Sequence, residues 1–296
     1  MKLPIVTQKL IILALTLLAF FWRVYRLDVQ SYWIDETWTL YFTNLSPALL
    51  WELLRTVEIK PALYYFAAKY WIELTGNGEF ALRFFSAIFG VLAVPLTYRL
   101  GKALGDARLG LITALLITFN PYQIWHSQDA RLYSIFTAAS VLSMWGFVNC
   151  WRRSSRRWWL VYIAGTLWAL YTHFHGFLLI GIQGLFLLLT WRRHRRGYLK
   201  WGASLAVIFL FYLPTLIASA EILQTFTNWI EQPTLPEAFV RSAVAYSVGE
   251  IVPRSAALLF ALAFCVVYGL GLVYAARRRW GIWRGPDMLA LLLAYT

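Results

Sequence analysis

Charged residues are scarce in this sequence. They make up 14% of its 296 residues, against 60% for hydrophobic ones, and the mean hydropathy is +0.59. A soluble domain carries about 25% charged residues, so the composition excludes an ordinary soluble fold and indicates an integral membrane protein. Cysteine is nearly absent as well. The two cysteines, Cys150 and Cys265, lie far apart within or at the end of apolar runs, which argues against a disulfide framework or a thiolate metal site.

Acidic residues are about half as frequent as basic ones, 14 against 27, which gives a formal net charge of +13. A nucleic-acid binder would have this sign, but the Lys and Arg residues form short clusters between apolar runs. Many of the 16 Trp, 17 Tyr and 20 Phe residues lie where an apolar run meets a charged one, as in the aromatic belt of a membrane interface. We therefore interpret the charge as a topology signal and expect no nucleic-acid partner.

Apolar runs close to the ~20 residues that cross a bilayer recur along the chain and predict an all-α, polytopic membrane fold. The predicted spans lie near 5–22, 80–98, 108–121, 130–150, 158–173, 175–191, 199–218 and 256–276. A further run begins after Asp287 and the sequence stops within it, so we expect a C-terminally truncated chain. Residues 1–296 are predicted to form a single transmembrane domain.

The segment 61–75 is apolar but short, since as a helix it would reach only about 22 Å. It carries Lys69 and Glu73 at the helical i,i+4 spacing, and we expect it to lie in the membrane interface. If this segment does not cross the membrane, 18 of the 27 basic residues lie on the same side as the N-terminus, and 12 of the 14 acids lie on the other side. The positive-inside rule then predicts a cytoplasmic N-terminus. The external connections are 23–79, 120–129, 173–175 and 219–255.

The cytoplasmic connections are short and basic, and they contain no Gly-rich phosphate loop. We therefore expect the chemistry on the external face. In the first external connection, "SPALLWELLRTVEI" has Ser46 as a candidate N-cap, Pro47 at the first helical position and leucines along one stripe. This pattern predicts a helix lying on the membrane surface.

The stretch "SYWIDETWTL" places two acids, Asp35 and Glu36, in aromatic and aliphatic surroundings. Two interpretations are open. The acids are an N-cap and a first-turn acid of a helix beginning "TWTLYF", or they belong to a catalytic site in which a half-dry carboxylate acts as general base.

Lys60 and Arg131 are candidate phosphate ligands. Lys60 precedes Pro61 at a helix start, where free N–H groups and an ammonium attract an anion; the alternative is a lysine that snorkels to lipid headgroups. Arg131 lies at the outer mouth of a span in "NPYQIWHSQDARLYS" and would hold phosphate bidentately. The alternative interpretation is that Arg131 forms a salt bridge with Asp129 or extends its charged end to the membrane interface.

The remaining candidates are polar residues of two external connections, which we expect to line a cavity. They are His126, Gln128, Asp129, Tyr133, His173 and His175. The two histidines of "YTHFHG" would suit a metal, but no third ligand with a supporting spacing is visible. We expect no cofactor, and a divalent metal has no support in the sequence.

The motifs "WIDETWT", "KPALYYF", "ALRFFSAIFGVLAVPLTYRLGK" and "NPYQIWHSQDARLYS" together resemble those of the GT-C membrane glycosyltransferases. The resemblance is to the bacterial proteins of glycosyltransferase family 39, related to protein O-mannosyltransferases and to aminoarabinose transferase. It covers roughly the first 200 residues. It implies a GT-C-type transmembrane helix bundle with interfacial helices in the first external loop.

The resemblance further implies an enzyme that moves a sugar from a polyprenyl-phosphate carrier to a lipid, glycan or protein acceptor, with inversion, outside a bacterial plasma membrane. By motif match, Asp35 would be the general base and Glu36 would orient the acceptor or share that role. Lys60 would bind the carrier phosphate with support from Arg131. Where many relatives read Pro-Pro, this chain has Pro61 and Ala62. The alternative function is a transporter or flippase for lipid-linked sugars, which would place ionisable residues at mid-membrane.

Overall fold

The computed structural model describes residues 4–56, 62–153, 155–190, 197–223, 234–248 and 254–277. These residues form helices and no strand. The helices are α1 (Ile5–Val24), α2 (Ile34–Asn44), α3 (Pro47–Thr56), α4 (Leu63–Thr75), α5 (Glu79–Leu104), α6 (Ala107–Phe119), α7 (Pro121–Ser127), α8 (Tyr133–Arg153), α9 (Arg156–Thr172), α10 (Gly176–Leu189), α12 (Tyr198–Leu223), α13 (Leu235–Ser247) and α14 (Arg254–Arg277).

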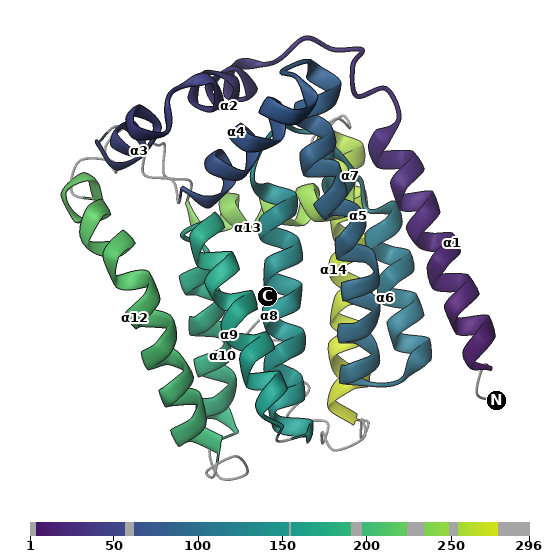
Figure 1. Ribbon diagram of the computed structural model, residues 1–296. Coiled ribbons are helices and arrows are strands. Elements are labelled where there is room, and N and C mark those ends of the chain that lie inside the picture. Colours follow the sequence, from purple (N-terminus) through teal and green to yellow (C-terminus); the bar gives the residue numbers. More distant parts are fainter. Residues whose placement is uncertain are drawn as a thin grey trace.

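The long helices run side by side as a bundle, and α2, α3 and α4 lie across one end of it (Figure 1). The start of α1 lies at the opposite end (Figure 1). All eight predicted spans correspond to helices of the bundle, so the predicted all-α fold is confirmed. Among the described residues, three helices are long and apolar enough to cross a membrane, namely Ile5–Val24, Glu79–Leu104 and Tyr198–Ala218. Shorter apolar helices cover Ala107–Phe119, Gly176–Leu188 and Ala256–Leu270.

One of the three helices across the end begins at a side-chain cap. The Ser46 hydroxyl accepts a hydrogen bond from the Leu49 amide at 3.4 Å, so the predicted N-cap of α3 is confirmed. Within the predicted segment 61–75, residues 63–75 form α4, which lies with α2 and α3 at the end of the bundle. Its Lys69 pairs with Glu73 at 2.9 Å, as the i,i+4 spacing predicts.

Two helices within the external connections were not predicted. The Asn120 side chain accepts a hydrogen bond from the Gln123 amide at 2.9 Å and starts α7 at Pro121. Thr234 starts α13, since the Glu237 carboxylate accepts from its backbone amide at 2.9 Å. Both connections are therefore partly helical where a loop was expected.

Small residues let α8 and α9 approach closely. A Cβ at Gly146 would lie 2.6 Å from the Tyr162 backbone nitrogen, and one at Gly165 would lie 2.6 Å from that of Ser143. The Ser143 and Thr166 hydroxyls are 2.7 Å apart across the same contact. Close backbone packing with a few satisfied polar groups is the usual basis of helix association in a bilayer. It holds α8 and α9 together next to the connections that carry the candidate site residues.

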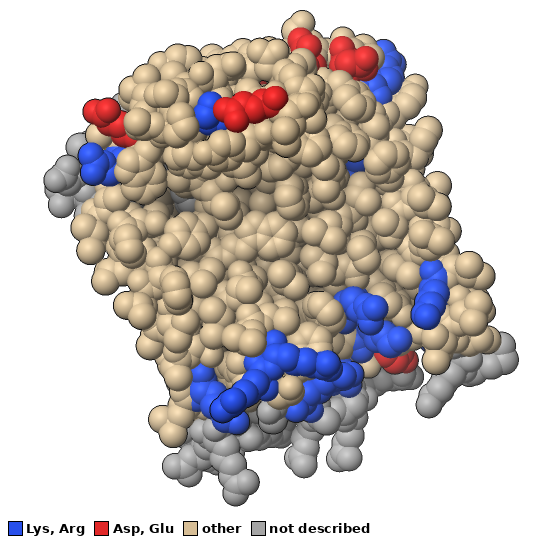
Figure 2. Space-filling view, viewed as in Figure 1, with Lys and Arg blue, Asp and Glu red and all other residues tan. Residues whose placement is uncertain are grey.

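Charge is segregated between the two ends of the bundle (Figure 2). Acidic side chains gather at the end formed by α2, α3 and α4, whereas most of the visible basic side chains lie at the other end. The uncharged surface between the two ends is rich in exposed apolar side chains, with Leu13 54%, Leu210 69% and Leu259 71% exposed. The distribution matches the predicted parity of the helices, in which the acidic connections share one face.

Candidate functional site

The two adjacent acids occupy opposite environments at the start of α2. Glu36 is fully buried, and its carboxylate accepts from Arg83 Nε at 2.8 Å, from Arg83 Nη2 at 2.6 Å and from the Ala130 amide at 2.8 Å. The Trp33 amide adds a fourth hydrogen bond at 3.3 Å. Both oxygens are thus occupied by protein donors. Glu36 is the first-turn acid of α2, and the helix begins at Ile34, earlier than expected.

Asp35 faces outward and remains accessible. Its side chain is 40% exposed, and Oδ2 lies 3.9 Å from Nη2 of Arg131. The same guanidinium donates through Nη1 to the Asp35 backbone carbonyl at 3.0 Å. A half-exposed carboxylate therefore lies beside a buried cation.

Arg131 lies in the loop before α8, and its side chain, only 5% exposed, is held against α2. Nε of this guanidinium is buried and has no hydrogen-bond partner. Burial lowers the Arg131 pKa, but neighbouring Tyr65, Tyr133 and Asp35 raise it by more, so the net shift is upward and the group is charged. Its ionic partner is Asp35 and not Asp129, the partner considered from the sequence.

Asp129 instead contacts Trp33 and His126. Its Oδ1 accepts from the Trp33 indole at 2.7 Å, and its Oδ2 lies 3.9 Å from His126 Nδ1. His126 stacks on Trp125 and packs against Tyr133, with ring centroids 5.0 and 4.5 Å apart. His126, Asp129 and Tyr133 thus form one cluster beside the start of α2, as expected of residues from one loop.

Gln128 and the histidine turn lie on other parts of the same end. The Gln128 amide donates to the Trp22 and Tyr25 carbonyls at 3.1 and 3.0 Å, which ties the end of α1 to the loop after α7. The rings of His173 and His175 are 4.3 Å apart between α9 and α10, and partial burial lowers the pKa of His175. Among the described residues, no group of three or more His, Cys, Asp or Glu could hold a metal ion.

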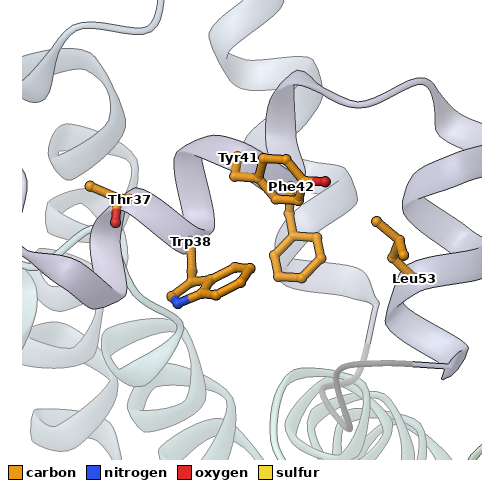
Figure 3. A pocket seen from close by; sticks show the side chains of 5 residues that line it. All are labelled: Thr37, Trp38, Tyr41, Phe42 and Leu53. Carbon is orange, nitrogen blue, oxygen red and sulfur yellow. The ribbon is translucent and has the colours of Figure 1, made fainter.

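Lys60 lies outside the described residues, so its role remains a prediction. Among the described residues, α2 and α3 border a groove of about 510 Å³ lined by Thr37, Trp38, Tyr41, Phe42 and Leu53. Figure 3 shows Trp38 and Phe42 pointing to the same side of α2, with Leu53 of α3 beyond them. Trp38 and Phe42 lie three and seven positions after Asp35, so these three residues share one face of α2. The aromatic groove therefore begins one turn from the accessible carboxylate.

Residues 59–217, more than half of the chain, match the family described as dolichyl-phosphate-mannose-protein mannosyltransferase. The chain belongs to this family. The predicted family resemblance is therefore confirmed.

A solved structure supports the GT-C fold of this mannosyltransferase-family chain. The chain matches ArnT from Cupriavidus metallidurans, in the apo state, with a TM-score of 0.57 and 15% sequence identity. The match covers 97% of this chain and 57% of that protein, so the chain spans somewhat more than half of its length. No curated protein matches the sequence.

Arg83 is the site residue of this family member that the sequence analysis missed. It is 6% exposed near the start of α5 and makes the bidentate pair with Glu36. A signal was present in the sequence, since a lone charge within "ALRFFSAIFG" is costly in an apolar segment unless it has a partner. The sequence could not show that this partner would be Glu36.

Proposed function

We propose that this chain is an inverting glycosyltransferase that moves a sugar from a polyprenyl-phosphate carrier to an acceptor hydroxyl on the extracytoplasmic face of a bacterial plasma membrane. Family membership and the fold support a membrane glycosyltransferase. The separation of acidic and basic ends supports an external site (Figure 2). The acceptor is a lipid, a glycan or a protein.

The observation that carries this proposal is the pair formed by Asp35 and Arg131. A 40% exposed carboxylate lies 3.9 Å from a buried guanidinium, which provides a base and an anion site next to each other. In the proposed step, Asp35 takes the proton of the acceptor hydroxyl while the oxygen attacks the anomeric carbon. The bond from that carbon to the phosphate oxygen breaks, and its electron pair leaves with the polyprenyl phosphate.

The leaving phosphate requires positive charge more than protonation, since it is already a weak base. Arg131 and Lys60 are proposed to supply this charge. Glu36 is left with a positioning role, because protein donors occupy both of its oxygens. His126, Gln128, Asp129, Tyr133, His173 and His175 are proposed to surround the substrates, and the step needs no cofactor and no metal.

The activity is tested with the purified protein in proteoliposomes that contain a polyprenyl-phosphate sugar and an acceptor extract. We expect sugar to appear on the acceptor with inverted anomeric configuration, measured by NMR, and one polyprenyl phosphate to be released per sugar. Movement of intact sugar lipid across the vesicle membrane without release of polyprenyl phosphate would contradict the proposal and favour a transporter or flippase.

The topology is tested by reporter fusions. A phosphatase reporter, active only outside the cytoplasm, is placed after Gly105 at the end of α5 and, as the matched fusion, after Gly76 at the end of α4. We expect activity from the Gly76 fusion alone, because parity puts α2, α3 and α4 outside. Activity from the Gly105 fusion would overturn the external placement of Asp35.

A further inference from the structure

The proposed catalytic pair lies on two segments that are far apart in sequence. Asp35 belongs to the first turn of α2, and Arg131 to the loop between α7 and α8. An error of 1 Å in the placement of reacting groups costs about 10²-fold in rate. Something in the fold must therefore fix these two segments against each other.

The Glu36 carboxylate joins these segments. It follows Asp35 directly, and its Oε1 accepts from the amide of Ala130, which directly precedes Arg131, at 2.8 Å. Consecutive Cα atoms are about 3.8 Å apart, so this contact holds the backbone one residue away from each member of the pair. The same Oε1 also accepts from Arg83 Nε at 2.8 Å.

Arg83 anchors that carboxylate to α5 and is fully engaged in doing so. Two of its donors reach Glu36 at 2.8 and 2.6 Å. The others reach three backbone carbonyls, those of Leu27 at 2.6 Å, Gln30 at 2.7 Å and Ser31 at 3.2 Å. A guanidinium has five N–H donors, and here all five are used. Arg83 has no donor left for a substrate.

The anchor also fixes the chain that leads into α2. Residues 25–33 connect α1 to α2 without a regular helix, so carbonyls in this segment that are shielded from water, such as that of the buried Leu27, need donors from elsewhere. Arg83 supplies them from the first turns of α5, a helix that packs against α1, α4, α6 and α8. Arg83 is thus fixed by the bundle and in turn holds Glu36, which contacts both segments that carry Asp35 and Arg131.

We infer that Arg83 is a positioning residue for the transfer reaction, acting through Glu36 on Asp35 and Arg131. This inference rests on the proposed function. Lysine at this position would keep the charge, but it has three donors on a flexible stem and no planar fork. Arg83→Lys would therefore loosen the Glu36 carboxylate without leaving it unpaired.

The test compares Arg83→Lys with Arg99→Lys, the same change at an exposed position of the same helix. We expect kcat per folded molecule to fall about 10²-fold in Arg83→Lys, with a smaller change in donor Kd, and no change in Arg99→Lys. Glu36→Gln should reproduce the loss. The double variant should be no worse than the poorer single variant, because both changes release the same contact.

Hydrogen exchange provides a readout that is independent of activity. The Ala130 amide should exchange faster in Arg83→Lys and in Glu36→Gln than in the wild type, and the Arg99→Lys control should match the wild type. Wild-type kcat in folded Arg83→Lys, additive losses in the double variant, or unchanged exchange at Ala130 would each overturn the inference. If the wild-type protein transfers no sugar, the proposed function fails, and exchange still decides whether Arg83 holds this segment.

Discussion

Asp35→Asn is expected to abolish sugar transfer, with kcat falling about 10³-fold, while the protein still inserts and folds. Asparagine has the same shape but cannot take a proton, and a positioned general base contributes about 10² to 10⁴-fold in rate. The carboxylate is 40% exposed, and the backbone carbonyl of residue 35 still accepts a hydrogen bond from Arg131 after the change, so we expect the protein to fold. Turnover is measured by release of polyprenyl phosphate from proteoliposomes.

Donor binding separates this result from damage to the site. Removing a negative charge 3.9 Å from the Arg131 guanidinium should leave phosphate binding unchanged or make it tighter, since Asp35 competes with the phosphate for that cation. Asp28→Asn is the matched control, because Asp28 is an exposed acid in the segment before α2. Full turnover in Asp35→Asn, or weaker donor binding together with lost turnover, would rule out Asp35 as the base.

The different environments of Asp35 and Glu36 mark the limit of what the sequence predicts. Both acids were placed at one helix start in the first external connection, and both lie there. Adjacent residues on a helix point about 100° apart, so the two carboxylates face different directions, and in the structure one of them faces the bundle. Which one does so depends on how α2 packs against α5 and the loop before α8, and periodicity within α2 alone does not contain that information.

Two contacts with a local cause were predicted from the sequence, whereas the local caps of α7 and α13 were missed. The cap of α3 by Ser46 and the pair of Lys69 with Glu73 depend on residues within four positions of one another. The contacts of Arg83 with Leu27, Gln30 and Ser31 span more than 50 positions. Lys60 stays a prediction, since the resemblance gives it a role and it lies outside the described residues.

The environment of Arg131 leads to the second large effect. Its side chain is 5% exposed, with an unpartnered Nε, so an anion that reaches it meets a cation in a region of low dielectric. Loss of one preorganised donor of this kind costs about 10² to 10³-fold in turnover. We expect Arg131→Gln to lose turnover by about this factor and also to bind polyprenyl phosphate more weakly, measured by titration.

This pattern differs from that of Asp35→Asn, in which donor binding is kept. Arg131→Lys should fall between wild type and Arg131→Gln, because it keeps the charge but not the planar fork that matches a phosphate. Arg55→Gln, a change at an exposed arginine of α3 on the same end of the bundle, should behave as wild type. Folding should survive in both Arg131 variants, since the carboxylate left behind on Asp35 is already partly hydrated. Unchanged donor affinity in folded Arg131→Gln would remove Arg131 from the phosphate site and leave Lys60 as its proposed cation.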